Sequence, residues 1–536
     1  MNDLKSRSAF LRALPYGVLV AALLLSVCLY AQYGAHNLDA DMSSEMVLAD
    51  LLNKEGSLLS ANWYYSTELR VVSPVPVYQL GLLLFDSWHV ARTFSIAVLL
   101  VGVAVSFLYL ARGAGMGEGA VYAAAVIVLP VSEAYAFLFA YGGFYTVYFM
   151  LACWLMGIVL RLRAKRHRVR CFFLLGVLSV WGGMAGVRML MICGIPLAMA
   201  CAAGWLLQGR HFERISQIRD ADCTAVGLGS VVVLAGMAVG YGINAKMLSS
   251  IYHFSGYGDE QMSSFGLGRL VEQFESLFEF FGYRNGVPVF SAAGIGGLAA
   301  VVLVFMMCAA LYGLFRMRAR LSAAQRMIPL FAVCAVGIGM LLNGTTNRGG
   351  SVYTVAYYMV GVLLVVASAF LLIEKLPCRL PVLSNALMLA LTLLFALPAV
   401  GYWTDAFRKE QAEYEEAAAW LVQQGCTEGF ATFWNGNVLT EASDGQIEVI
   451  TYDSWQNTRP GDWLQQTAHR DELPQGRVFV YVTDDELEGH VPCAQEAHLA
   501  YRTQGGAIYL YDSAQEVDQL QRGQPMLTED MEESQE

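Results

Sequence analysis

Long apolar runs separated by short polar segments dominate the first 403 residues of this 536-residue chain. A helix needs about 20 mostly apolar residues to cross a hydrocarbon core of roughly 30 Å. Eleven segments meet that requirement, which predicts a polytopic α-helical membrane domain over residues 1–403. The predicted crossings are 13–31, 89–110, 118–139, 143–160, 171–187, 189–207, 224–245, 289–315, 327–343, 352–373 and 381–403.

The basic residues predict which helix ends face the cytoplasm. Lys and Arg collect in cytoplasmic loops. With a cytoplasmic N-terminus, and with the tail left out, the inside segments hold 19 of them against 8 in the rest of residues 1–403. The apolar run 171–207 is too long for one crossing, so the glycines of Trp181-Gly-Gly-Met-Ala-Gly-Val-Arg188 should break it, with Arg188 near the outer surface. Eleven crossings then leave the C-terminal part outside. The first helix could instead be a cleaved signal peptide, although the acidic residues after it favour a retained helix.

Two predicted outer loops, 32–88 and 246–288, are too long to be plain connectors. The first should contain a helix that runs to about Lys54, followed at 75–85 by an apolar segment too short to span the membrane. In the second, apolar residues recur at helical spacing from Leu267 to Phe281. This pattern predicts an amphipathic helix that lies on the outer membrane surface or packs against the bundle.

The pattern changes after residue 403. Residues 404–515 predict a small extracytoplasmic α/β domain, which begins with a polar helix at 405–424 and continues with short β-like runs. The acidic, polar stretch 516–536 is expected to be disordered. The β-like runs are 429–434, 446–451, 477–482, 498–503 and 507–512.

Composition supports this division. Charged residues make up only 15% of the chain, against roughly 25% in a typical soluble domain. The net charge of −11 is uneven, because residues from Thr404 onward carry 7 Lys and Arg against 26 Asp and Glu. An acidic tail without a basic, aromatic-rich stripe argues against a nucleic-acid partner. Of 11 cysteines, only Cys426 and Cys493 fall in the tail, and an oxidising compartment would allow them to form a disulfide.

Ionisable residues at the outer ends of the predicted helices are the candidates for chemistry. Such residues are costly in a membrane and often functional, although buried Arg–Glu pairs are a structural alternative. Asp41 could instead be a helix N-cap, and Glu45 is expected to be a solvated helix charge. No Walker, His-Glu-x-x-His or Gly-x-Ser-x-Gly motif occurs. The candidate residues are Asp39, Asp41, Arg92, Glu133, Arg188 and Arg348.

These residue types suit group transfer from a lipid phosphate. A carboxylate at the membrane surface can act as general base toward a hydroxyl. Arginines can hold a phosphate and stabilise its departing charge, and Arg188 and Arg348 are predicted to converge on it. A long apolar bundle can admit a polyprenyl tail. The pair Asp39 and Asp41 could hold a divalent cation, but two carboxylates alone predict no metal.

Four short stretches near the outer ends of the predicted helices carry a resemblance to a known family. They are Asn37-Leu-Asp-Ala-Asp41, Ala91-Arg-Thr-Phe-Ser95, Leu129-Pro-Val-Ser-Glu133 and Gly186-Val-Arg188. With these stretches, and in architecture over roughly residues 10–400, the chain resembles the GT-C superfamily of polyprenyl-phosphate-sugar glycosyltransferases, especially bacterial relatives of protein O-mannosyltransferases. The resemblance implies an inverting reaction in which Asp39 or Asp41 is the base. The Asp-Glu pair common in the family is Asp-Ala-Asp here, so the choice between the two aspartates stays open.

The function expected from the sequence is an integral glycosyltransferase of the plasma (cytoplasmic) membrane. It would use an undecaprenyl- or dolichyl-phosphate sugar on the outer face, with a cell-surface glycan, lipid or protein as acceptor. Two alternatives remain open. One is a lipid or polysaccharide transporter or flippase, against which no inverted repeat or pair of interrupted helices is evident. The other is a lipid-linked glycan polymerase or ligase, which would share the lipid donor.

Overall fold

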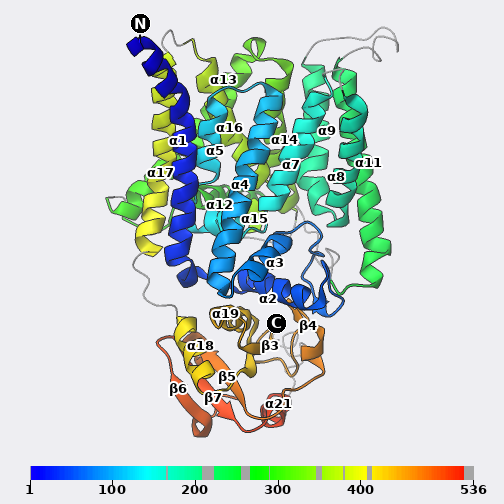
Figure 1. Ribbon diagram of the computed structural model, residues 1–536, viewed down its shortest axis with the longest axis vertical. Coiled ribbons are helices and arrows are strands. Elements are labelled where there is room, and N and C mark those ends of the chain that lie inside the picture. The colour runs from blue at the N-terminus through cyan, green and yellow to red at the C-terminus, as the bar shows by residue number, and fades with distance from the viewer. Residues whose placement is uncertain are drawn as a thin grey trace.

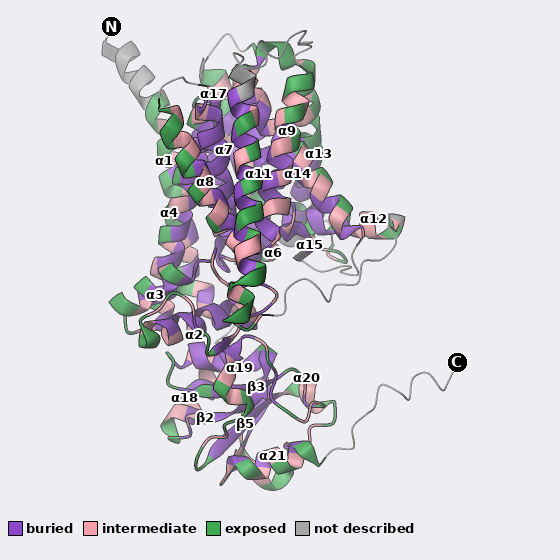
Figure 2. Cartoon of the chain, turned by 90° about the vertical axis from the view of Figure 1, so that its right-hand side faces the viewer, coloured by how far each residue is buried: buried purple, intermediate pink, exposed green. Residues whose placement is uncertain are grey.

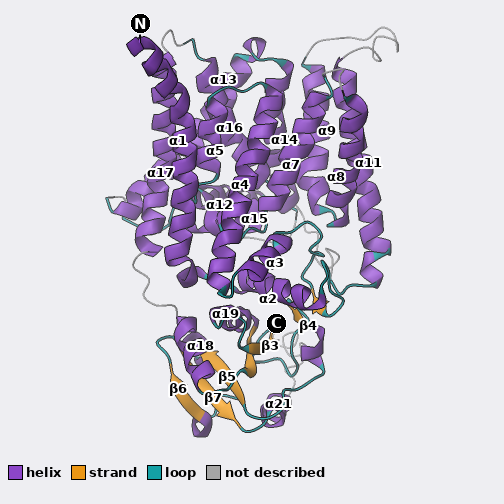
Figure 3. Ribbon diagram, viewed as in Figure 1, coloured by secondary structure: helices purple, strands orange, loops and turns teal. Residues whose placement is uncertain are grey.

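The computed structural model describes residues 2–163, 167–207, 222–254, 266–288, 290–345, 353–377, 381–406 and 413–523. It consists of a helical bundle with a smaller α/β domain at one end (Figures 1 and 3). Buried residues fill the inside of the bundle, and exposed residues lie on its outer faces (Figure 2). Large apolar residues such as Leu24, Phe305 and Leu393 are among the exposed ones. Such an apolar exterior is typical of helices that face lipid.

Six described helices are long and apolar enough to cross a membrane, by length and composition. Each corresponds to one of the predicted crossings. These six are α1 (Asn2–Tyr33), α4 (Trp88–Ala114), α11 (Asp222–Lys246), α13 (Ala292–Arg316), α14 (Ala323–Asn343) and α17 (Pro381–Ala406).

The other five predicted crossings contain shorter or interrupted helices. They are α5 (Gly119–Ile127) with α6 (Glu133–Tyr135) and the π-helical turn η2 (Ala136–Ala140); α7 (Thr146–Arg161); α8 (Arg168–Met184); the π-helical turn η3 (Leu190–Gly194) with α9 (Ile195–Leu206); and α15 (Tyr353–Ala356) with α16 (Met359–Lys375).

The predicted break in the run 171–207 is confirmed. Helix α8 ends at Met184, and Gly186 adopts a φ of +103°, which side chains larger than hydrogen rarely allow. Glycine also lets α8 and α11 approach closely, because a Cβ at Gly183 or Gly240 would clash with the facing backbone. The glycines therefore both end one helix and permit its tight packing.

The two long loops contain the expected helices, and the short apolar segment at 75–85 in the first loop is helical as well. Helix α2 (Ala40–Glu55) and helix α3 (Val75–Leu84) lie across the end of α4 that faces the α/β domain (Figure 1). In the second loop, α12 (Leu267–Phe280) packs on the bundle through Leu277 and Phe280, while Val271 and Phe274 are exposed. It projects sideways from the bundle (Figure 2).

The α/β domain is built on a five-stranded sheet in the order β3-β2-β5-β7-β6. Strand β2 pairs in parallel with β3 and β5, whereas β7 pairs antiparallel with β5 and β6. All five strands lie within two residues of the predicted runs. They are β2 (Glu428–Thr432), β3 (Glu448–Tyr452), β5 (Val478–Thr483), β6 (Leu499–Arg502) and β7 (Gly506–Tyr511).

Helices flank the sheet, with α18 (Glu413–Gln423) before it and α19 (Phe433–Ala442) between β2 and β3. The expected disorder from residue 516 is wrong for residues 516–522. Helix α21 (Ala514–Arg522) continues there, because Val517 and Gln521 are buried against the domain.

The predicted disulfide between Cys426 and Cys493 is also wrong. Both thiols are free and buried. Cys426 packs with Phe479 and Tyr481, whereas Cys493 packs with Val480, whose side chain points to the other face of the same strand. The sheet therefore lies between the two cysteines, and sequence position alone could not reveal this.

A buried ion pair joins the α/β domain to the bundle. The guanidinium of Arg92 in α4 donates to both carboxylate oxygens of Glu441 in α19, at 2.6 and 2.7 Å, and to the carbonyl of Met42. Beside it, the Asp444 carboxylate accepts from the Trp88 backbone N–H at 2.6 Å. A second link is the antiparallel pairing of β1 (Trp63–Tyr64), in the first long loop, with β4 (Gln465–Gln466).

We expect Glu441→Gln to destabilise the docking of the two parts, since it leaves the Arg92 charge buried without its counter-ion. Removing one partner of a buried pair typically costs about 3–5 kcal/mol. The measurements are the thermal unfolding midpoint in detergent and the rate at which protease releases the α/β domain.

The matched control is Asp518→Asn, which removes the more exposed pair with Arg522 on α21 and should cost no more than about 1 kcal/mol. Equal, small effects of the two variants would show that the Arg92–Glu441 pair does not hold the domain.

Candidate functional site

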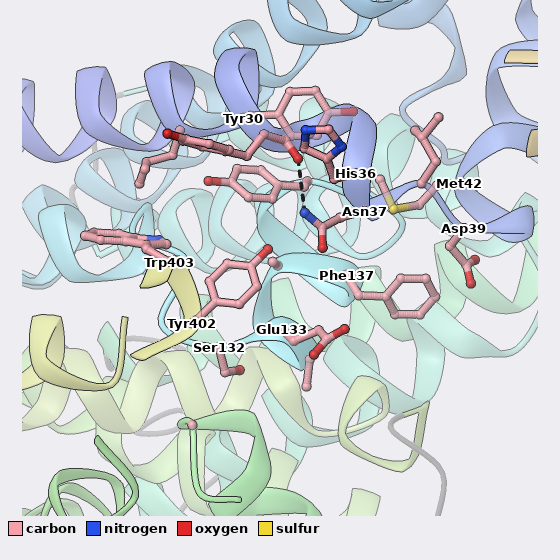
Figure 4. A pocket seen from close by; sticks show the side chains of 18 of the residues that line it. Tyr30, His36, Asn37, Asp39, Met42, Ser132, Glu133, Phe137, Tyr402 and Trp403 are labelled. Atoms are coloured by element: carbon pink, nitrogen blue, oxygen red, sulfur yellow. Dashed lines mark hydrogen bonds between the residues drawn. The ribbon is translucent and has the colours of Figure 1, made fainter. Parts of the chain in front are cut away.

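A cavity of about 830 Å³ lies where the bundle meets the α/β domain. Its wall comes from the end of α1, the turn η1 (Gly34–Asn37), the start of α2 and the two residues before it, the segment around α6, the end of α12 and the segment after it, the end of α17 and one residue of α19. Figure 4 shows part of this wall. Its size is within the range of about 300–1,000 Å³ typical of ligand pockets. The polar and charged side chains in its lining are His36, Asn37, Asp39, Ser132, Glu133, Glu279, Arg284 and Asn285.

Asp39 is the N-cap of α2 and also lines the cavity. It has extended backbone geometry, and its carboxylate accepts a 2.9 Å hydrogen bond from the backbone N–H of Asp41. Burial, followed by the nearby Asp41 charge, raises the pKa of Asp39 to about 6, although backbone N–H groups of Asp41 and Met42 oppose the shift. A carboxyl group that titrates near neutral pH is suited to proton transfer.

The other acidic residues of this segment have different surroundings from those expected. Asp39, and not Asp41 as proposed, is the N-cap, because α2 begins at Ala40. Asp41 occupies the first turn and is not among the described residues of the cavity wall. Glu45, expected to be solvated, is buried and pairs with Arg70 at 2.7 Å. Only Asp39 of the three is thus exposed to the cavity.

Glu133 reaches the cavity because the chain is not helical just before it. Helix α5 ends at Ile127, and the chain resumes as α6 with Ser132 as N-cap, whose hydroxyl accepts from the Tyr135 N–H and donates to the Phe280 carbonyl. Asp39 and Glu133 appear on either side of Phe137 in Figure 4. The structure therefore brings two of the predicted site residues to one cavity.

Two of the predicted arginines, Arg92 and Arg188, do not join them. Arg92 is fully buried and paired with Glu441. It therefore forms the buried Arg–Glu pair that was the structural alternative to a role in binding. Arg188 donates from Nε to Glu68 at 2.7 Å and also bonds the Tyr145 hydroxyl; neither arginine is among the described lining residues. Arg348 lies outside the described residues, so its predicted convergence with Arg188 is not addressed by the structure.

Three charged or titratable lining residues were missed by sequence reasoning: His36, Glu279 and Arg284. His36 lies in the acidic segment after the first helix, and Arg284 follows the amphipathic helix α12 by four residues. Position next to these segments was the only available signal. In the described part of the chain, no group of three or more His, Cys, Asp or Glu side chains could hold a metal ion.

No protein-family model and no curated protein matches this chain. Solved structures do match. Apo ArnT from Cupriavidus metallidurans is similar with a TM-score of 0.54 and 11% identity, over 92% of this chain and 98% of that one. The same protein bound to undecaprenyl phosphate gives a TM-score of 0.53 at 11% identity, over 92% and 97%. The apo oligosaccharyltransferase of Archaeoglobus fulgidus gives 0.50 at 15% identity, over 84% and 67%.

The chain has the fold of ArnT and of the archaeal oligosaccharyltransferase, as expected from the GT-C resemblance. This confirms the resemblance seen in the sequence at the level of architecture. Because 92% of the 536 residues match ArnT and the membrane part ends near residue 403, the likeness extends into the α/β domain. The six apolar helices and the GT-C fold together make this a membrane protein.

Proposed function

We propose that this protein is an inverting membrane glycosyltransferase, which transfers a sugar from a polyprenyl-phosphate carrier to an acceptor hydroxyl on the outer face of the membrane. The observation that carries the proposal is the cavity, in which a carboxyl group of raised pKa, a guanidinium and an apolar wall come together. The GT-C fold and the undecaprenyl phosphate bound by ArnT support the choice of donor.

Asp39 acts as the general base in this proposal. It takes the proton of the acceptor hydroxyl as that oxygen attacks the anomeric carbon. The bond between the anomeric carbon and the phosphate oxygen breaks, and the polyprenyl phosphate leaves with the electron pair. A single displacement inverts the anomeric centre. The cavity position of Asp39 favours it over Asp41.

Arg284 is the proposed partner of the departing phosphate, in place of Arg92 and Arg188, whose guanidinium groups are bonded to buried glutamates. A guanidinium suits this role because it presents several donors to a phosphate in one plane. Arg348 remains a proposed second phosphate ligand. Glu133 is proposed to accept hydrogen bonds from donor-sugar hydroxyls.

The lipid tail is proposed to leave the cavity along α1 and α17. Their ends contribute Leu29, Tyr33 and Trp403 to the wall. Farther along the same helices, Leu24 and Leu393 are exposed. An apolar path from cavity to membrane would let the phosphate reach Arg284 while the isoprenoid chain stays in lipid.

We expect Asp39→Asn to lower the transfer rate about 10²–10⁴-fold, the usual contribution of a general base. Asp41→Asn should retain near-wild-type transfer. Asn caps a helix about as well as Asp, so Asp39→Asn should unfold like the wild type, whereas Asp39→Ala should lose about 1 kcal/mol. The assay follows labelled sugar from the lipid-phosphate donors of membrane extracts into cell-surface acceptors.

The pH dependence of the transfer rate gives a second test of the role of Asp39. Only deprotonated Asp39 can accept a proton, so transfer should rise with pH up to about 6, by about tenfold per unit below that value, and then level off. Full transfer by Asp39→Asn would overturn the base assignment. Unchanged lipid-linked sugars and surface glycans in a deletion strain would count heavily against sugar transfer.

Arg284→Gln should weaken binding of undecaprenyl phosphate about tenfold to a hundredfold, because hydrogen bonds to charged groups contribute about 1.5–3 kcal/mol. Native mass spectrometry of the purified chain measures the bound lipid. The matched control is Arg318→Gln, an exposed arginine at the far end of α13. If both variants bind the lipid equally, Arg284 is not the phosphate ligand.

The proposed orientation has a cytoplasmic N-terminus, eleven crossings and an extracytoplasmic α/β domain. Fusions after Gln515 should therefore give active alkaline phosphatase and non-fluorescent green fluorescent protein. The opposite pair of results would require an even number of crossings and would move the cavity to the cytoplasmic side.

A further inference from the structure

One residue of the α/β domain enters the wall of the cavity. Trp434, at the start of α19, lines it together with Asp39 and Glu133, although these residues belong to the bundle and its first loop. The residue is 59% exposed, although tryptophans are highly buried on average. The neighbouring Phe433 is buried. Phe433 therefore anchors the start of α19, while the ring of Trp434 stays exposed.

The backbone that carries Trp434 is held at both ends of α19. At the start, Phe433 packs in a cluster with residues of the first long loop, and Thr432 and Asn435 both donate to Glu486. At the other end lies the Glu441–Arg92 ion pair. The ring is therefore presented by a fixed scaffold, which lowers the entropic cost of using it for binding.

Trp434 belongs to a different part of the protein from the residues of the proposed lipid path. The proposed lipid path uses α1 and α17, which are membrane helices. Trp434 comes instead from the polar α/β domain, the side from which a water-soluble substrate would enter. A flat, exposed indole offers an apolar face to the C–H groups of a sugar ring, while Asn285, which lines the same cavity, can bond the hydroxyls of that sugar.

We propose that Trp434 is a specificity-determining residue that binds a saccharide acceptor by stacking on one of its rings. The inference rests on the proposed function, which it deepens by naming the acceptor class. The α/β domain then completes the substrate site, and the Arg92–Glu441 pair sets the position of the ring.

The test measures binding, so it does not depend on turnover. The full-length chain in detergent is applied to an array of microbial oligosaccharides. Wild type should bind at least one saccharide, Trp434→Ala should bind it about tenfold more weakly, and Trp434→Phe should lie closer to wild type because it keeps an aromatic face. Trp205→Ala, which removes an exposed indole from α9, is the matched control and should bind like wild type.

Each result is decisive once Trp434→Ala is shown to have the thermal midpoint of the wild type. No saccharide bound by the wild type, or equal binding by Trp434→Ala, overturns the inference while leaving sugar transfer to be judged by Asp39→Asn. Equal losses for Trp434→Ala and Trp205→Ala also overturn it. Saccharide binding that needs Trp434, in a chain that transfers no sugar, would support the inference and refute the proposed function.

Discussion

A guanidinium buried at the end of a membrane helix cannot stay uncompensated, because an unpaired charge in a low-dielectric interior costs several kcal/mol. Arg92 is fully buried in this structure, and the counter-ion is Glu441, 349 residues further along the chain. Together with the Asp444–Trp88 hydrogen bond and the β1–β4 pairing, this ion pair holds the α/β domain against the bundle. Helix α19 must lie against α2 and α4, and its first turn then reaches the cavity that holds Asp39.

The same solution recurs in the first long loop. Glu45 pairs with Arg70, and Glu68 pairs with Arg188. The loop therefore does more than connect two helices, since it neutralises its own Arg70 and supplies Glu68 as the counter-charge of Arg188 in the bundle. The charged groups that face the cavity, among them Arg284, form a set separate from these pairs.

Asp39 combines two physical roles that are usually separate. As an N-cap it binds the N–H of Asp41, which favours its ionised form, but burial and the neighbouring charge raise its pKa to about 6. The capping bond fixes the carboxyl group in position, and the raised pKa lets it exchange a proton near neutral pH. A position that begins a helix can thus also serve as the base of a reaction.

Local patterns in the sequence determined much of this protein. Hydropathy located the helices of the bundle, glycines located the break after Met184, and β-like runs located five strands within two residues. These features depend on neighbours a few positions apart, so they can be read from the chain. Acidic residues after the first helix also pointed to Asp39, without distinguishing it from Asp41.

Only the tertiary structure decided which of those residues meet. Arg92 belonged to an ion pair rather than a binding site, Cys426 and Cys493 lay on opposite faces of the sheet, and Arg284 and Trp434 entered the cavity from distant segments. Partner choice depends on long-range packing and on which face a side chain takes. Neither quantity has a local signature in the sequence, because a shift of one residue reverses a strand's faces and a buried charge accepts a partner from anywhere in the chain.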